Sequence, residues 1–133
     1  MATDTERNKQ IVLDFLDAFT TFDAERYEPF LADDPVYQVG MTVHQGRAGF
    51  ADVARFGRIL YPNGQDRRTV RYVAAEGDVV AMLVTIDATT NSGASYTNDY
   101  ALFFVLEHGK IKLQVEILDF RVSADKFDLS ALG

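Results

Sequence analysis

Hydrophobic and polar residues alternate most regularly along residues 98–120. This spacing predicts two strands joined by a tight turn at 107–110, where Gly109 can adopt the positive φ of a hairpin turn. In the second strand, polar residues separate the apolar residues Ile111, Leu113, Val115 and Ile117. A period of two predicts one buried face and one solvated face. Asp119 follows on the apolar face, so we expect a carboxylate at a buried position there.

Helical and extended patterns divide the rest of the chain. Apolar residues recur at helical spacing in 5–21, 24–31 and 48–60, and a capping box of Thr3 and Glu6 marks the first helix start. A short strand is expected at 36–40, long strands at 69–75, 79–89 and 96–106, and a last helical turn near Phe127. Helices followed by an antiparallel meander predict an α+β fold, with the helices packed on one face of a curved sheet.

The chain is expected to form one domain, residues 1–133, because it has no linker, repeat or low-complexity stretch. The predicted strand at 100–106 is apolar on both sides: the helices can cover one side only. We therefore expect a homodimer formed through the sheet face.

Composition excludes several classes of protein. The chain has no cysteine, which rules out disulfides and thiolate metal sites, and its two histidines lack the spacing of metal ligands. A net charge of −7 without a basic cluster argues against nucleic acid and anionic membranes as partners. No apolar stretch is long enough for a membrane span, and the N-terminus has no signal-peptide pattern. We expect a cytoplasmic protein without a metal or cofactor.

Several short motifs carry a resemblance to a known family. Two N-terminal helices precede ADDPVYQVG and QGRAGFADVARF, and a meander ends in GKI with a carboxylate eight residues after its Ile. From about Glu6 to Phe127 the chain resembles the SnoaL-like branch of the nuclear transport factor 2-like (NTF2-like) superfamily. The resemblance implies a cone-shaped sheet wrapped around a helix and enclosing a deep apolar pocket. The superfamily includes polyketide cyclases, limonene-epoxide-hydrolase-like enzymes, steroid isomerases and non-catalytic binding domains, so the fold does not define a reaction.

The match to family site residues is partial. Tyr37 matches the tyrosine of the epoxide hydrolases' Tyr-x-Asn motif, but Val39 stands in place of its asparagine. Asp87 matches the aspartate of their Arg-x-Asp motif, but Thr85 stands in place of its arginine. Asp119 matches their last aspartate and also the acid/base aspartate of the SnoaL cyclases. The base of the steroid isomerases has no counterpart after the first strand.

These matches give a hypothesis for the site. Asp119 would move a proton, Asp87 would be its partner acid or base, and Tyr37 would hold an oxygen. The expected pocket wall consists of Asp99, Phe15, Phe19, Phe56, Phe103, Val39 and Thr85. The alternative for Asp119 is a strand-end residue that caps a loop or pairs with Arg121, and for Asp87 and Asp99 it is a solvated position on a strand. His44 is either at the pocket rim or on the surface.

Two functions follow from this hypothesis. The first is a cofactor-independent acid/base enzyme that cyclises, isomerises or opens the epoxide of a small apolar molecule, such as a polyketide or terpenoid. The alternative is a non-catalytic dimer module that binds a small molecule or is purely structural. The missing arginine and asparagine favour the alternative.

Overall fold

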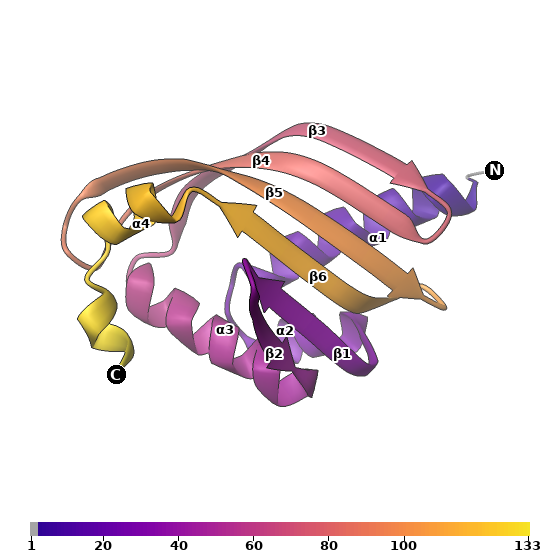
Figure 1. Ribbon diagram of the computed structural model, residues 1–133. Coiled ribbons are helices and arrows are strands. Elements are labelled where there is room, and N and C mark those ends of the chain that lie inside the picture. Colours follow the sequence, from indigo (N-terminus) through magenta and orange to yellow (C-terminus); the bar gives the residue numbers. More distant parts are fainter. Residues whose placement is uncertain (1–2) are drawn as a thin grey trace.

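A strongly curved sheet covers the helices in the computed structural model, which describes residues 3–133 (Figure 1). The helices are α1 (Asp4–Phe19), α2 (Ala24–Tyr27), α3 (Gly46–Leu60) and α4 (Phe120–Lys126), with 3₁₀ turns η1 (Glu28–Phe30) and η2 (Leu129–Leu132). The strands are β1 (Leu31–Val39), β2 (Thr42–Gln45), β3 (Gln65–Glu76), β4 (Val79–Thr89), β5 (Ser95–Glu107) and β6 (Lys110–Leu118). Met1 and Ala2, which belong to the predicted domain, lie outside the described residues.

The sheet order is β2-β1-β6-β5-β4-β3. Strands β3 to β6 form the predicted antiparallel meander, and β1 joins it by pairing in parallel with β6. At the β5–β6 turn, both His108 and Gly109 have positive φ, as the hairpin prediction requires. The predicted α+β fold is confirmed.

The first helix forms where the sequence predicted it. The side chain of Thr3 accepts a hydrogen bond from the Glu6 N–H, and Glu6 returns one to the Thr3 N–H, which completes the capping box. Val12, Phe15 and Phe19 then bury one face of α1. On the opposite wall, the even-numbered residues of β5 from Tyr96 to Leu106 are buried while most odd-numbered ones are exposed. The core therefore lies between the helices and the concave face of the sheet.

A β-bulge at Lys112 changes the predicted orientation of β6. Leu106 pairs with Ile111, but Val105 pairs with Leu113, so Lys112 is an extra residue in the ladder. Ile111 is fully buried, whereas Ile117 on the same sequence row is 49% exposed. After the bulge the concave side of β6 carries Gln114, Glu116 and Leu118. The prediction of one continuous buried row from Ile111 to Asp119 is therefore wrong.

Three element boundaries also differ from expectation. The second helix ends earlier, and β1 begins at Leu31, because this segment already pairs with Ile111 of β6. The hairpin strand β2 was not predicted; its residues pair with the end of β1. At the C-terminus, the expected single helical turn is a two-turn helix, α4, followed by η2.

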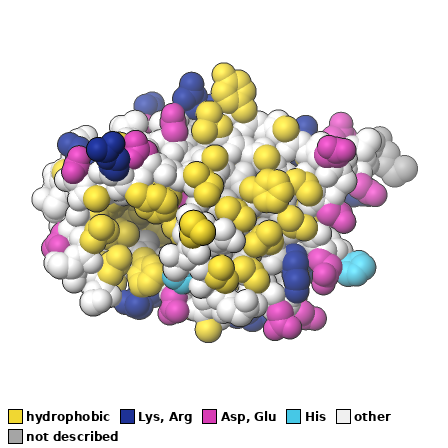
Figure 2. All heavy atoms as spheres, in the orientation of Figure 1, with side chains coloured by type: hydrophobic (Ala, Val, Ile, Leu, Met, Phe, Trp, Pro, Cys, Tyr) yellow, Lys and Arg dark blue, Asp and Glu magenta, His cyan; other side chains and the backbone are white. Residues whose placement is uncertain are grey.

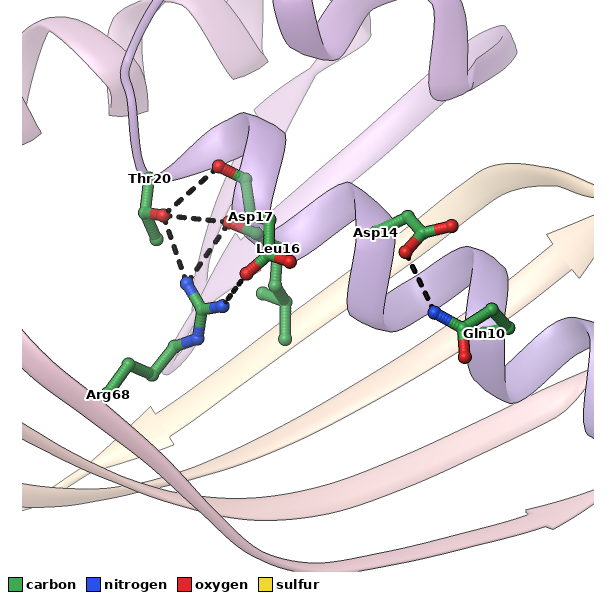
Figure 3. A network of polar contacts seen from close by, with 6 residues as sticks. All are labelled: Gln10, Asp14, Leu16, Asp17, Thr20 and Arg68. Carbon is green, nitrogen blue, oxygen red and sulfur yellow. Dashed lines mark hydrogen bonds and ion pairs between the residues drawn. The ribbon is translucent and has the colours of Figure 1, made fainter.

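An arginine of β3 joins the sheet to the end of α1 (Figure 3). Arg68 Nη1 donates to the Leu16 carbonyl at 3.2 Å and to Thr20 Oγ1 at 3.0 Å. Its Nη2 contacts the Asp17 carboxylate. A cation is favourable at this place because the last carbonyls of a helix lack partners and carry partial negative charge. Arg68 thus positions α1 against the sheet.

Replacing this arginine tests its contribution to stability. Arg68→Met keeps most of the side-chain volume but removes the charge-assisted hydrogen bonds to α1. We expect the free energy of unfolding in urea to fall by about 2 kcal/mol. The matched control is Arg67→Met, because Arg67 is exposed and forms only a surface ion pair with Asp87 at 3.4 Å. A change for the control below about 0.5 kcal/mol is expected, and equal effects of the two variants would contradict the assignment.

Candidate functional site

A cavity of about 770 Å³ lies between the concave face of the sheet, α1, α3 and the C-terminal segment. Most of its wall is apolar, including Leu16, Phe19, Val53, Phe56, Val84 and Leu102. The turn at Gly40 and Met41, together with Phe120, Leu129 and Leu132, also contributes to the wall. Figure 2 shows a hollow bordered by hydrophobic side chains on the left of the face drawn there. A cavity of this size and polarity suits a small apolar molecule.

A carboxylate and a tyrosine meet inside this cavity. The hydroxyl of Tyr37, on β1, donates to Oε1 of Glu116, on β6, at 2.9 Å. The parallel β1–β6 register brings these strands together here, with Tyr37 opposite Gln114. Phe19 and Phe50 hold the Tyr37 ring, with ring centroids 5.6 and 5.1 Å away. The pair therefore has a defined geometry within an apolar wall.

Burial changes the proton affinity of both partners. Removal from water raises the pKa of Glu116 to about 7, while the hydrogen bond from Tyr37 acts in the opposite direction. Burial, followed by the nearby charge of Glu116, raises the pKa of Tyr37 well above its usual value. Among the described residues that line the cavity, Glu116 is the only carboxylate. Because both of its protonation states are populated near neutrality, Glu116 can accept or release a proton there.

A chain of hydroxyl groups forms the second polar region. Tyr61 and Tyr100 have their hydroxyl oxygens 3.1 Å apart, and Tyr100 lies 2.6 Å from the hydroxyl of Tyr96. Tyr96 also lies 2.9 Å from Ser123 Oγ of α4. Tyr61, Tyr100 and Ser123 line the cavity, whereas Tyr96 does not. Burial raises the pKa of both Tyr61 and Tyr100, and the charge of Glu116 adds to this increase.

Three further side chains that line the cavity each bury a polar atom without a partner. These atoms are Oε1 of Gln65, Nε of Arg68 and Oε1 of Gln114. Gln114 is only 1% exposed and lies two residues before Glu116 on the same face of β6. Buried polar groups are usually hydrogen-bonded in folded proteins. These atoms are therefore available to a water molecule or a polar group of a ligand.

The expected position of Asp119 is wrong. This residue is exposed and caps α4, where its carboxylate accepts hydrogen bonds from the N–H groups of Arg121 at 3.0 Å and Val122 at 3.4 Å. The bulge at Lys112 changes the face of every later β6 residue, and the strand ends at Leu118. The alternative interpretation, a strand-end residue that caps a loop, is closer to the structure, but the segment that Asp119 caps is the helix α4.

Asp87, Asp99 and Thr85 lie on the outer face of the sheet, away from the cavity. Asp87 accepts hydrogen bonds from Thr97 at 2.6 Å and from Arg67 at 3.4 Å. The bond from Thr97 is the main reason that its pKa is lowered. Thr85 donates to Asp99 at 2.6 Å, and Arg71 lies 3.5 Å from the same carboxylate. The structure therefore does not bring Asp87 and Asp119 together as an acid/base pair.

The remaining predicted wall residues divide into two groups. Phe19, Phe56, Val39 and Tyr37 line the cavity, and so does His44. Phe15 is fully buried behind the wall, where its ring packs against Phe19, and Phe103 is 40% exposed on the outer face. The sequence therefore identified part of the apolar wall and its tyrosine.

The main functional candidate that the sequence interpretation missed is Glu116. If β5 and β6 paired regularly from their two-residue turn onward, Glu116 would lie on the outer face of the sheet and Asp119 on the inner face. Only the extra residue at Lys112 reverses this assignment, and we find no pattern around it that predicts a bulge. The hydroxyl chain was missed for a different reason, because its members come from the C-cap of α3, from β5 and from α4, and meet only in the folded protein.

Within residues 3–133, no helix combines the length and the hydrophobicity that a membrane span needs. In the same residues, no cluster of three or more histidine, aspartate or glutamate side chains could hold a metal ion.

The raised pKa of Glu116 predicts a specific pH dependence of stability. Its pKa increases from 4.5 to about 7 on folding, so the folded state binds the proton more tightly. Its contribution is fully present below about pH 4.5 and is lost as the pH rises through 7. Relative to Glu116→Gln, the free energy of unfolding of the wild type should therefore decrease between pH 5 and 8, by no more than about 3 kcal/mol. Parallel urea curves at each pH measure this difference, and a constant difference would contradict the raised pKa.

Comparisons with known proteins agree with this architecture. The SnoaL-like domain family matches residues 12–114. A search of curated proteins found no match. Solved structures with the same fold include an NTF2-like protein from Burkholderia xenovorans LB400, which has 18% identity and a TM-score of 0.77 over 94% of this chain and 98% of that one.

Two further structures carry more specific descriptions. TerC, co-crystallised with polyporic acid, has 22% identity and a TM-score of 0.77 over 90% of this chain and 97% of its own. A provisionally assigned SnoaL-like polyketide cyclase from Jannaschia sp. CCS1 has 14% identity and a TM-score of 0.78 over 95% and 94% of the two chains. At these identities the structural likeness shows the fold alone. The family match covers most of the sequence, and the chain therefore belongs to the SnoaL-like domain family.

Proposed function

We propose that the protein is a cofactor-independent acid/base enzyme that acts on a small apolar molecule inside the cavity. The observation that carries the proposal is a single carboxylate, Glu116, whose burial in an apolar wall raises its pKa to about 7. A carboxyl group with this pKa is suited to proton transfer at neutral pH. One structural neighbour is provisionally assigned as a SnoaL-like polyketide cyclase, and another, TerC, was crystallised with a small molecule, polyporic acid.

In this proposal Glu116 replaces Asp119 as the proton carrier. As a carboxylate it takes a proton from a carbon or oxygen of the substrate, and as the neutral acid it returns the proton to another atom. Tyr37 holds Oε1 of Glu116 by donating its hydroxyl proton, so the second oxygen of the carboxylate remains available to the substrate. Phe19 and Phe50 prevent the tyrosine ring from moving away.

Isomerisation and ring closure are the reaction classes that we favour. Both need one group that moves a proton, and desolvation supplies the required basicity without a metal. Epoxide opening in the related hydrolases uses two carboxylates bridged by an arginine. Here the described cavity wall has one carboxylate, and the predicted partner, Asp87, is on the outer face. Of the three expected reactions, epoxide opening therefore has the least support.

A generic probe can test proton transfer before the substrate is known. A base removes the proton at C3 of 5-nitrobenzisoxazole, the ring N–O bond breaks, and a coloured phenolate forms. We expect turnover that rises with pH and has a midpoint near 7. Glu116→Gln should lower kcat/KM by about 10² or more. Tyr37→Phe should move the midpoint to higher pH, because the hydrogen bond from Tyr37 lowers the pKa of Glu116.

Asp119→Asn and Asp87→Asn are the matched controls, since each removes a carboxylate outside the cavity. Asparagine can still cap α4, so the fold should be retained. Both variants should turn over the probe like the wild type. A rate no higher than that of free acetate would contradict the proposal. Retained binding of an apolar dye without turnover would then support the alternative, a non-catalytic binding module.

We also propose that the protein forms a homodimer through the outer face of the sheet. Figure 2 shows hydrophobic side chains over β5 and β6 on this face. Tyr72 is 67% exposed, Ile117 49% and Phe103 40%, and the last two lie on the neighbouring strands β5 and β6. A continuous apolar face of this kind is typical of a protein–protein contact.

Light scattering at micromolar concentration tests this assembly. A single chain has a mass of 14.9 kDa, so the expected particle has about twice that mass. Phe103→Glu would place a charge in the proposed contact and should produce monomers. The control Phe120→Glu changes an exposed phenylalanine outside the sheet face and should leave the dimer intact. A monomeric wild type would contradict the proposal.

A further inference from the structure

The hydroxyl chain described above has an orientation that can be partly determined. Asn98 Oδ1 accepts a hydrogen bond from the Asp99 N–H at 2.9 Å. Asn98 Nδ2 donates to the Asp119 carbonyl at 3.0 Å. These two backbone contacts fix the carboxamide, so Nδ2 must also be the donor in its 2.9 Å contact with the Tyr96 hydroxyl. Tyr96 therefore accepts one hydrogen bond before any other hydroxyl is considered.

The number of hydroxyl protons in this hydroxyl chain determines how many hydrogen-bond donors it presents to the cavity. Tyr61, Tyr100, Tyr96 and Ser123 have one hydroxyl proton each, and three oxygen–oxygen contacts join them. Each contact uses one proton, so one proton has no acceptor within the chain. If the free proton were on Tyr96, this oxygen would have to accept from Asn98, Tyr100 and Ser123, which exceeds its two lone pairs. The free proton therefore belongs to Tyr61, Tyr100 or Ser123.

All three of these residues line the cavity, which thus receives one hydrogen-bond donor in every allowed arrangement. The partner of this donor is a water molecule or, when a ligand is bound, an acceptor atom of that ligand. Glu116 lies close enough for its charge to affect Tyr61 and Tyr100, so an anionic oxygen at the same place would be repelled once Glu116 is ionised. A neutral acceptor is favoured, and the surrounding apolar wall favours a hydrophobic frame.

We propose that the Tyr61–Tyr100 pair, supported by Tyr96, Ser123 and Asn98, is a subsite that binds the carbonyl oxygen of a neutral apolar ketone or aldehyde. The proposal rests on the proposed function in taking the cavity as the substrate site. It adds the substrate class and the position of the reactive group. A carbonyl held there lies near Glu116, where a proton on a neighbouring carbon can be transferred.

Equilibrium dialysis with two isosteric probes tests the subsite without any turnover. The ketone 2-acetylnaphthalene has a carbonyl oxygen where 2-isopropenylnaphthalene has a CH₂ group. We expect the wild type to bind the ketone about fivefold to tenfold more tightly than the hydrocarbon, as one neutral hydrogen bond allows. The triple variant Tyr61→Phe/Tyr100→Phe/Ser123→Ala removes all three hydroxyls of the group that line the cavity, and it should bind both probes equally. The control Tyr72→Phe removes an exposed hydroxyl and should keep the preference.

The proton count makes a second, sharper prediction. Tyr61→Phe removes one proton and one contact together, so one donor still faces the cavity and most of the ketone preference should remain. If Tyr61→Phe alone abolished the preference for the ketone, the inference that the remaining hydroxyls still provide a free donor would be overturned. Equal binding of the two probes by the wild type, or no binding of either, would overturn the subsite whatever the variants do. Tighter binding of 2-naphthoate than of the ketone at pH 8 would overturn the neutral substrate class.

The same measurement in Glu116→Gln separates this inference from the proposed function. This variant lacks the ionisable carboxyl group but keeps the hydroxyl chain, so the ketone preference should persist. If the preference is present and turnover of 5-nitrobenzisoxazole is absent in the wild type, the subsite stands and the acid/base function fails. If turnover is present and the preference is absent, the subsite fails alone.

Discussion

The extra residue at Lys112 is the constraint on which the rest of the site depends. A bulge bends its strand and increases the local twist, which helps a sheet to close around a core. A second irregularity lies beside the bulge: the β1–β6 register shifts between Leu31 and Val36. Lys112 Nζ donates to the Asp33 carbonyl in that segment at 2.8 Å, which connects the two strands. Beyond this point Glu116, rather than an aliphatic residue, faces the cavity.

The bulge places a carboxyl group where its charge is costly. An ionised group in an apolar wall loses solvation, and Glu116 responds with a raised pKa and a hydrogen bond from Tyr37. The hydroxyl chain is a similar arrangement, since the buried tyrosines form hydrogen bonds with one another and Asn98 donates to Tyr96. Both groups lie in the cavity that the curved sheet creates. The curvature, the cavity and the altered proton affinity therefore have a common structural origin.

The carboxylates on the outer face have a different physical role. Asp87 lies between Arg67 of β3 and Thr97 of β5, and Asp99 lies beside Thr85 and Arg71. Pairs of this kind across neighbouring strands stabilise a sheet by modest amounts. Asp87 matches the aspartate of the Arg-x-Asp motif of the epoxide hydrolases, but a match in sequence does not specify which face of a strand a side chain occupies. The same residue types can therefore stabilise the sheet in this protein and take part in catalysis in other proteins.

The sequence by itself determined the helices, the meander and the α+β fold. Capping, helical spacing and the Gly109 turn are local signals, and each acts within a few residues of the chain. It also identified Tyr37, Phe19, Phe56 and Val39 as wall residues. Only the tertiary structure decided on which side of the sheet Asp87 and Glu116 lie, and that Asp119 caps α4. A single extra residue in a ladder changes the face of every residue after it, and such a bulge depends on strand pairing that no local pattern records.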